Sequence, residues 1–484
     1  MRIVHADIHL IDLRTRLPFQ YGIATMTHAP HVFVRTLVEL EGRTVCGIAA
    51  DVLPPKWFTK VPEKPLDEEV DEMLSVIEHA AQSSIGLHGQ TTFDLWRQLF
   101  DLQDRWGSSQ KLPSLLTQFG TSLIERALIE AACKLVELPF ADAVRKNRLG
   151  IQLGELVPGL AGAEPGDLLP EKPRTPVIAR HTIGMADPLT STDIAADERL
   201  GDGLPQALSE CIGCYRLRHF KVKVSGDLKY DLPRVRRIAA LIAEHGPPDF
   251  AFTMDGNEQF RTLESFREFW QSISRAGGLS EFFGRLLFVE QPFHRDVALD
   301  PDILNGLRKW IARPLMIIDE SDAEPGSLHR ALDLGYHGTS HKNCKGIFKS
   351  IANACLLQQR RRDDPQATLI MSGEDLVNIG PVALLQDLAA AAALGVESIE
   401  RNGHHYLAGL SAFPPAVQRQ TLQAHADLYR KTEAGWPTLN IQNGKLDLRS
   451  VNAAPFGVGF ELDVEAFLPV AQWRRQQAGE TTQP

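Results

Sequence analysis

Four short apolar runs between His219 and Asp319 decide the fold of this chain. They read His-Phe-Lys-Val-Lys-Val (219–224), Phe-Ala-Phe-Thr-Met-Asp (250–255), Leu-Leu-Phe-Val-Glu (286–290) and Leu-Met-Ile-Ile-Asp (315–319). Each run has the length of a strand, contains or ends in polar residues, and is followed by a segment long enough for a helix. This alternation is typical of parallel strands joined by helices.

The same rhythm extends in both directions along the chain. Further runs of this kind are Val177–Gly184, Gly338–His341, Thr368–Met371 and Val396–Ile399. Polar residues at the ends of the later strands, from Lys223 to Glu400, follow one another at intervals of 23 to 35 residues. Eight such units predict an α/β fold of the (β/α) barrel (TIM) type, whose functional site lies at the carboxyl ends of the strands. A doubly wound sheet would usually carry a glycine-rich turn after its first strand, which Gly184-Met-Ala-Asp is not.

The residues before the barrel predict an N-terminal α+β capping domain. Alternating apolar residues indicate strands over residues 2–13, 32–41 and 45–50, and residues 67–102 have a helical pattern. Ser122 and Glu125 form a capping box, which predicts that a second helix begins there.

Proline-rich sequence and a return of strand patterns near the end of the chain divide it into segments. Strand-like runs at 439–446 and 458–462 indicate that the C-terminal segment packs back on the capping domain and completes it. The predicted boundaries are 1–150 for the capping domain, 151–176 for a linker, 177–415 for the barrel and 416–484 for the C-terminal segment.

Composition excludes several classes of protein. A net charge of −10 without a cluster of Lys and Arg argues against nucleic acid as a partner. The longest apolar stretch, Leu388–Val396, is too short to span a bilayer, and the N-terminus has no apolar block of a signal peptide. Cys211 and Cys214 form one C-x-x-C motif with no second pair to complete a zinc site. We therefore expect a cytoplasmic protein with unpaired thiols and no membrane association. Barrels of this type usually associate, so a homo-oligomer is expected as well.

Three consecutive predicted strands end in carboxylates: Asp255, Glu290 and Asp319. On neighbouring barrel strands these side chains converge and repel one another, so a cation is expected between them. Oxygen ligands without His or Cys select Mg²⁺, or alternatively Mn²⁺. The alternative interpretation is that each carboxylate caps the helix that follows its strand.

Three lysines are candidates for proton transfer. Lys221 and Lys223 are two residues apart on one strand and so share its inner face, next to the predicted carboxylates. Lys342 ends the sixth strand, opposite the second across the barrel. A base on each side of a substrate is what a racemase needs, and a nearby cation lowers the pKa of a lysine toward that of a base. The alternative is that Lys221 and Lys223 are exposed at a strand end.

Taken together, the patterns K-x-K, D-x-N, E-Q-P and D-E-S and the lysine of the sixth strand resemble those of the enolase superfamily. The resemblance is to its mandelate racemase and muconate lactonizing enzyme family, and within it to the muconate lactonizing enzyme and dipeptide epimerase branch. It covers most of the chain, and the motifs are specific in this order and spacing rather than singly. The mandelate racemase branch would show an Asp on the sixth strand and a His on the seventh, where this chain has Lys342 and Ser372-Gly373-Glu374.

The resemblance implies an enzyme that removes a proton from the carbon next to a substrate carboxylate. Asp255, Glu290 and Asp319 would hold Mg²⁺, which would stabilise the enolate. Lys223 and Lys342 would transfer protons on opposite faces and Lys221 would contact the carboxylate. The residues implied to orient these lysines and ligands are Asn257 and Glu320.

The resemblance leaves the outcome of the reaction open. Racemisation or epimerisation by an isomerase is the leading expectation. A cycloisomerase, or a lyase acting as a syn-dehydratase, fits the same residues, and a barrel that binds metal and ligand without turnover is a further alternative.

Substrate recognition is expected from two loops of the capping domain and from the eighth strand. The loops are residues 19–27, with Tyr21, and residues 51–58, with Trp57, which the resemblance implies form a lid over a small-molecule carboxylate. The eighth strand continues as Glu400-Arg-Asn-Gly-His404, without the paired aspartates that dipeptide epimerases use for the substrate amine. Glu400 and His404 are therefore candidate substrate contacts, and a dipeptide substrate is disfavoured.

Overall fold

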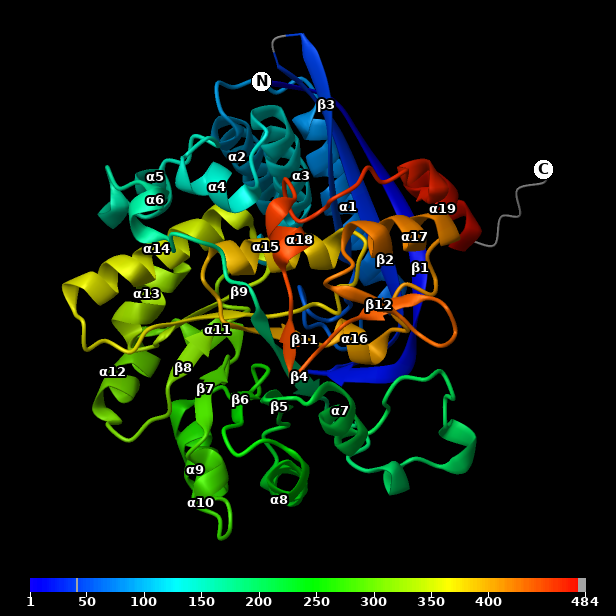
Figure 1. Cartoon of the computed structure of the whole chain (residues 1–484). Coiled ribbons are helices and arrows are strands. Elements are labelled where there is room, and N and C mark those ends of the chain that lie inside the picture. Colours follow the sequence, from blue (N-terminus) through cyan, green and yellow to red (C-terminus); the bar gives the residue numbers. More distant parts are fainter. Residues whose placement is uncertain (41, 478–484) are drawn as a thin grey trace.

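Eight parallel strands form a closed barrel in the computed structural model, which describes residues 1–40 and 42–477. The strands pair in sequence order, and the last pairs with the first (Figure 1). They are β4 Val177–Ile183, β5 His219–Lys223, β6 Ala251–Asp255, β7 Leu286–Glu290, β8 Met316–Ile318, β9 Gly338–His341, β10 Ile370–Gly373 and β11 Ser398–Arg401. The predicted barrel is confirmed, and each strand begins and ends within two residues of its predicted bounds.

Register aligns the carboxyl ends of the central strands. Lys223 pairs with Asp255, which pairs with Glu290 on the next strand. Polar residues at strand ends therefore meet at one end of the barrel, while the apolar residues between them pack on the surrounding helices.

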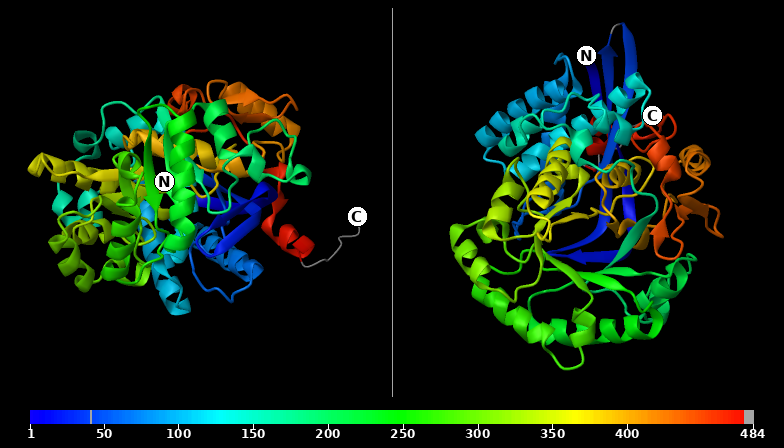
Figure 2. Two further views of the ribbon diagram at one scale, coloured as in Figure 1. Left: turned by 90° about the horizontal axis from the view of Figure 1, so that it is seen from below. Right: turned by 60° about the vertical axis from the view of Figure 1, so that its left-hand side comes forward.

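Helices cover the outside of the barrel (Figure 2). In chain order, the helices of this part of the chain are α7 Leu208–Tyr215, α8 Leu228–His245, α9 Leu263–Ser274, α10 Ser280–Phe283, α11 Arg295–Ala298, α12 Pro301–Lys309, α13 Ser327–Leu334, α14 Ile347–Asp363, α15 Ala383–Ala393, α16 Gly403–Tyr406 and α17 Pro415–Ala424, of which α16 contacts β1 of the capping domain.

An antiparallel sheet with three helices forms the capping domain. Its elements are β1 Arg2–Tyr21, β2 Ala24–Leu40, β3 Arg43–Val52, α1 Leu66–Ser84, α2 Thr92–Gln110 and α3 Ser114–Val136. The hairpin of β1 and β2 reaches the barrel and turns at Gly22, whose φ of +48° suits a tight two-residue turn. Residues 19–27, expected as a lid loop, are therefore mostly the tip of this hairpin, and both strands are longer than predicted.

The helices of the capping domain differ from the prediction in two places. The helical stretch predicted over 67–102 is two helices, because the chain leaves the helix at Ile85 and re-enters it through a capping box of Thr91 and Asp94. The helix predicted to begin at Ser122 begins at Ser114 instead. The capping-box prediction was wrong because Glu125 faces another helix, where its carboxylate accepts hydrogen bonds from the backbone N–H groups of Ile347 and Phe348.

The segment between the two domains contains short helices rather than extended chain. They are α4 Phe140–Arg145, α5 Leu153–Leu156, η1 Pro158–Leu160 and α6 Pro165–Leu168, followed after β4 by η2 Ser191–Asp193 and η3 Ala196–Glu198. Apolar residues such as Leu153 and Leu160 are buried there, so this segment packs on the rest of the molecule.

The C-terminal segment returns to both sheets. It comprises β12 Tyr429–Lys431, β13 Pro437–Leu439, β14 Lys445–Leu446, α18 Arg449–Ala453, η5 Val464–Ala466, β15 Leu468–Pro469 and α19 Val470–Gln477. β14 pairs with barrel strand β4, and β15 pairs with β1 of the capping domain. The return to the N-terminal sheet is as expected, but the strand predicted over 458–462 does not form.

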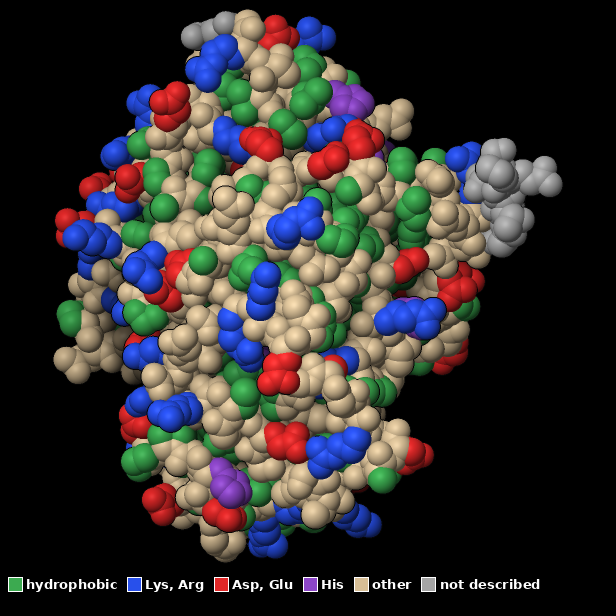
Figure 3. Space-filling model, turned by 45° about the vertical axis from the view of Figure 1, so that its right-hand side comes forward, with side chains coloured by type: hydrophobic (Ala, Val, Ile, Leu, Met, Phe, Trp, Pro, Cys, Tyr) green, Lys and Arg blue, Asp and Glu red, His purple; other side chains and the backbone are tan. Residues whose placement is uncertain are grey.

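Charges of both signs are interspersed on the face of the molecule shown in Figure 3. None of the helices in the described part of the chain has the length and apolar character needed to cross a membrane.

Candidate active site

The polar strand ends surround a small cavity of about 30 Å³, which is room for a water molecule or two. The barrel contributes most of its walls, and the hairpin tip and the segment after β3 close it from above. The lining residues are Phe19, Tyr21, Pro54, Trp57, Lys221, Lys223, Asp255, Asn257, Asp319, Lys342, Asp375, Leu376, Val377, Glu400 and Asn402. A larger cavity of about 690 Å³ on the capping domain includes none of the predicted catalytic residues.

Lys221 lies at the centre of the buried charges. Its Nζ is 3.0 Å from Asp255 Oδ2, 2.8 Å from Glu290 Oε2, 2.8 Å from Glu374 Oε2 and 3.1 Å from Glu400 Oε2. Burial alone would lower the pKa of Lys221, but Asp255 and the other carboxylates raise it well above its usual value. Lys221 is thus a buried ammonium ion, not a lysine exposed at a strand end.

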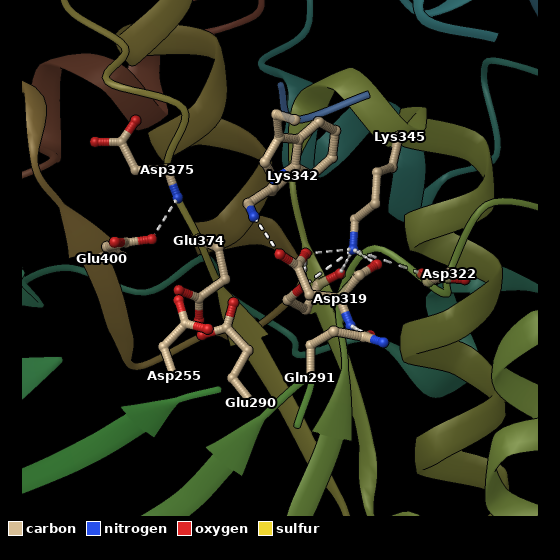
Figure 4. A network of polar contacts seen from close by, with 12 residues as sticks. Asp255, Glu290, Gln291, Asp319, Asp322, Lys342, Lys345, Glu374, Asp375 and Glu400 are labelled. Atoms are coloured by element: carbon tan, nitrogen blue, oxygen red, sulfur yellow. Dashed lines mark hydrogen bonds and ion pairs between the residues drawn. The ribbon is translucent and has the colours of Figure 1, made fainter. Parts of the chain in front are cut away.

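Asp319 belongs to a second group of charges, at the ends of the neighbouring strands β8 and β9. Its carboxylate pairs with Lys342, lies 3.2 Å from Lys345 Nζ, and accepts a hydrogen bond of 2.5 Å from Ser340. Figure 4 shows Asp319 pointing toward these two lysines, whereas Asp255, Glu290 and Glu374 point toward one another. The lysines hold the pKa of Asp319 well below its usual range, although burial alone would raise it.

The three predicted metal ligands do not converge as tightly as expected. Asp255 and Glu290 both contact Lys221, while Asp319 faces Lys342. Their oxygen atoms do not form a group in which all lie within 4.8 Å of one another.

These residues nevertheless fit a hard divalent cation. All the donors are carboxylate oxygens, which Mg²⁺ and Mn²⁺ prefer. Glu290 Oε2 is buried and has no hydrogen-bond partner with good geometry, although Lys221 lies within ion-pair distance. Burial and the negative charges of Asp255 and Glu374 raise the pKa of Glu290 well above its usual value. A cation bound here would stabilise the ionised form of Glu290.

Lys223 and Lys342 lie on opposite walls of the same cavity. Their strands, β5 and β9, are four positions apart in the ring of eight. Lys223 Nζ donates to Asp255 Oδ2 and to Asn257 Oδ1, both at 2.9 Å, and Lys342 Nζ lies 4.7 Å from the centre of the Trp57 ring. Despite its burial, the pKa of Lys342 is raised by Asp319, opposite to the direction expected of a base.

Only one of the two residues expected to orient these groups makes such a contact. Asn257 accepts the hydrogen bond from Lys223. Glu320 is buried, and its Oε2 has no hydrogen-bond partner among the described residues. Burial and the nearby Asp319 raise the pKa of Glu320 to about 7.

The four candidate substrate contacts lie in different surroundings. Tyr21, Trp57 and Glu400 line the cavity. The carboxylate of Glu400 is already bound by Lys221, by Thr182 Oγ1 at 2.5 Å and by the backbone N–H of Asp375 at 3.1 Å. His404 is not among the lining residues, because its ring packs against His181 and Tyr215.

Sequence reasoning missed two buried charged residues of this site, Glu374 and Lys345. Glu374 directly follows β10 and binds both Lys221 and Arg180. Lys345 donates to the Ser340 carbonyl oxygen at 2.6 Å and supports Asp319. Glu374 carried the same signal as the metal-ligand candidates, an acidic residue at a strand end, whereas the role of Lys345 depends on a turn that only the structure shows.

The segment after β3 that covers the cavity is held to the barrel by polar contacts. Arg295 donates to the backbone carbonyl groups of Phe58 and Trp57, each at 2.9 Å, and its guanidinium pairs with Glu258 at 2.7 Å. Lys60 pairs with Glu258 as well. A substrate larger than a few atoms requires this segment or the hairpin tip to move.

Comparison with solved structures identifies proteins of the same architecture. A dipeptide epimerase from Enterococcus faecalis, complexed with Mg and the dipeptide L-Leu-L-Tyr, matches with a TM-score of 0.58 and 16% identity over 95% of this chain and 100% of that one. An enolase from Bradyrhizobium, complexed with magnesium and mandelic acid, matches with a TM-score of 0.58 and 15% identity over 97% and 98% of the two chains. A muconate lactonizing enzyme from Pseudomonas fluorescens, complexed with muconolactone, matches with a TM-score of 0.58 and 17% identity over 96% and 98%.

These matches confirm at the level of the fold the resemblance that the motifs indicated. The similarity extends over nearly the whole of both chains, so it includes the capping domain as well as the barrel. No family model matches the chain, and no curated protein is similar to it in sequence.

Proposed function

We propose that this chain belongs to the mandelate racemase and muconate lactonizing enzyme family of the enolase superfamily, and that it abstracts a proton alpha to a substrate carboxylate in a Mg²⁺-dependent reaction. The leading outcome is racemisation or epimerisation. The observation that carries the proposal is the placement of Lys223 and Lys342 on opposite walls of one cavity that Asp255 and Asp319 also line.

The architecture supports an isomerase. The structures with this fold include an epimerase and a muconate lactonizing enzyme, and two of them were complexed with magnesium. At this level of identity a shared fold does not show that two proteins act on the same substrate. The reaction proposed for this chain therefore depends on its own residues.

Each lysine has a defined task in the proposed reaction. Lys223 Nζ would accept the α proton on one face of the substrate, and Lys342 Nζ would return a proton on the other face. In the reverse direction the two exchange roles. Asn257 holds Lys223 by a hydrogen bond of 2.9 Å, and the Trp57 ring lies beside Lys342, so both Nζ atoms are positioned before substrate enters.

Asp255, Glu290 and Asp319 would hold the cation. Mg²⁺, or Mn²⁺ in its place, supplies positive charge next to the substrate carboxylate and so stabilises the enolate. Lys221 adds a fixed positive charge next to Asp255 and Glu290, and Trp57 is part of the cavity wall.

Deuterium exchange tests the proposal directly. Single enantiomers of α-substituted carboxylates are incubated with the protein and Mg²⁺ in D₂O, and label at the α carbon is followed by NMR. We expect exchange with inversion for the wild type and its loss after the metal is removed with EDTA. Lys223→Ala and Lys342→Ala should each abolish interconversion, while each retains exchange of the one enantiomer whose proton faces the remaining lysine.

A control separates this effect from the loss of positive charge in general. Lys229 is an exposed lysine in α8, and Lys229→Ala should leave exchange unchanged. If both single-lysine variants exchange as fast as the wild type, the two-base proposal is wrong. If only one lysine matters and no inversion occurs, cycloisomerisation or syn-dehydration of a carboxylic acid replaces it. Metal binding without exchange of any carboxylate would favour a barrel that does not catalyse.

We further propose a small-molecule carboxylate as substrate, a cytoplasmic location and assembly into a homo-oligomer. Light scattering on the purified protein tests the last of these, and cell fractionation tests the location.

A further inference from the structure

A cluster of histidine and cysteine side chains lies near the candidate active site and is separate from its carboxylates. His181 comes from β4, Cys211 from α7 and His405 from α16, and all three are buried. One ligand atom from each lies within 4.8 Å of the other two, the only such trio of His, Cys, Asp or Glu in the described part of the chain. Cys211 Sγ is 3.7 Å from His405 Nδ1.

We propose that His181, Cys211 and His405 form a site for a zinc ion that is distinct from the magnesium site. Two imidazole nitrogens and one thiolate are ligands that Zn²⁺ accepts and Mg²⁺ does not. Three protein ligands leave one position of a tetrahedral zinc ion for water.

A carboxylate lies near the second ring nitrogen of His405, where a ligating histidine of a zinc site usually has an acceptor. Asp187 Oδ2 lies 3.9 Å from His405 Nε2, and the hydroxyl of Tyr406 and the backbone N–H of Gly184 hold Asp187 at 2.6 Å and 2.7 Å. His181 Nδ1 lies 3.2 Å from His404 Nε2, which orients the His181 ring.

The two histidines are ready to bind a metal ion, whereas the thiol must first lose its proton. Burial lowers the pKa of His181 and of His405 to about 3, so both rings are neutral near pH 7 and have a lone pair for a metal. Burial also raises the pKa of Cys211 well above its usual value. Zinc binding therefore breaks the S–H bond, forms a Zn–S bond, and releases the proton to the buffer.

The site would hold together three elements, two of which contact residues that line the active-site cavity. Next to His181 on β4, Thr182 donates to Glu400, and next to His405, Tyr406 stacks on Phe19 of the hairpin tip with ring centres 4.1 Å apart. A zinc ion would join β4, α7 and α16, and would increase the stability of the full chain by binding only the folded state.

Cobalt substitution tests the proposal. The full chain is reduced, stripped with a chelator, given excess Mg²⁺ to occupy oxygen ligands, and titrated with Co²⁺ without oxygen. We expect a thiolate-to-cobalt charge-transfer band that saturates at one equivalent, releases about one proton per ion, and disappears when Zn²⁺ is added.

Variants identify the ligands. Cys211→Ser and His405→Gln should lose the band, and Asp187→Asn should weaken zinc binding by about 10- to 100-fold. Cys214→Ser is the matched control, because Cys214 is exposed on the same helix and its replacement should leave the band intact.

Circular dichroism checks that each variant folds. If Cys211→Ser does not fold, the proposal is still tested by the number of cobalt ions that the wild type binds and by the loss of the band in His405→Gln. The proposal is wrong if the wild type shows no band, or if the band persists in folded Cys211→Ser. This outcome is independent of the deuterium-exchange experiment, which tests the proposed function.

Discussion

At the scale of single residues, the ammonium group of Lys221 contacts carboxylates that come from four places on the barrel: β6, β7, the end of β10 and β11. Charges buried together in this way stabilise a protein only as a set, because removing one partner leaves the others without compensation. Lys221 is therefore important for folding as well as for the proposed chemistry.

Lys221→Met should destabilise the protein by about 3–5 kcal/mol, because it leaves four buried carboxylates without their common partner. Added Mg²⁺ should restore part of this loss by supplying the missing positive charge. Urea unfolding with and without Mg²⁺ measures both effects. Lys229→Met, at an exposed lysine, should change neither. A Lys221→Met protein as stable as the wild type would show that the ammonium does not hold these carboxylates.

At the scale of elements, α3 of the capping domain is joined to barrel helix α14 by one carboxylate. Glu125 accepts hydrogen bonds from the backbone N–H groups of Ile347 at 3.1 Å and Phe348 at 2.7 Å, at the N-terminus of α14 where a helix favours negative charge. Burial outweighs these hydrogen bonds and raises the pKa of Glu125 from 4.5 to about 7.

The raised pKa of Glu125 predicts how stability depends on pH. Below about pH 4.5 Glu125 is protonated in both the folded and unfolded chains, so it has no effect. As the pH rises toward 7 the unfolded chain loses this proton first, so the free energy of unfolding should fall by about 1–3 kcal/mol. Glu125→Gln should remove this share of the decrease.

Urea unfolding at several pH values between 4.5 and 8 measures the slope. The exposed Glu137, at the end of the same helix, is the control, and Glu137→Gln should keep the wild-type slope. Equal slopes for wild type and Glu125→Gln would contradict the prediction.

At the scale of the whole molecule, the capping domain closes the mouth of the barrel, and polar contacts join its covering segment to the barrel. Arg295, at the start of α11, donates to the backbone carbonyl groups of Trp57 and Phe58, and Glu258 binds both Arg295 and Lys60. These polar contacts join the covering segment to the barrel, and breaking them would allow the segment to open.

Arg295→Ala should weaken this closure. We expect faster proteolytic cleavage in the covering segment. We also expect the KM for the carboxylate substrate to rise about tenfold, because losing about 1.4 kcal/mol of the free energy that favours the closed state changes an equilibrium by a factor of ten. Limited proteolysis and exchange kinetics measure these effects. Arg261→Ala is the control, since Arg261 is exposed and forms an ion pair with the exposed Asp296. Unchanged proteolysis and KM would show that Arg295 does not hold the cover.

Much of the fold could be predicted from the sequence because it depends on local patterns. The eight barrel strands are apolar runs of strand length at regular intervals, and their polar ends must meet once the barrel closes. This reasoning placed Lys221, Lys223 and Asp255 in one site. It failed at Ser122, where a local capping signal competes with a helix that begins at Ser114, and at residues 19–27, where a glycine turn continues two strands.

Only the tertiary structure decided which distant side chains meet. Lys221 contacts Glu374 and Glu400, more than 150 residues away, and the zinc proposal depends on Cys211 lying beside His405. Such contacts follow from the packing of whole elements, to which no local pattern in the chain corresponds. The sequence by itself therefore determined the barrel and the chemical character of its mouth. The tertiary structure decided the pairing of its charges, because burial and distance set the energy of each pair.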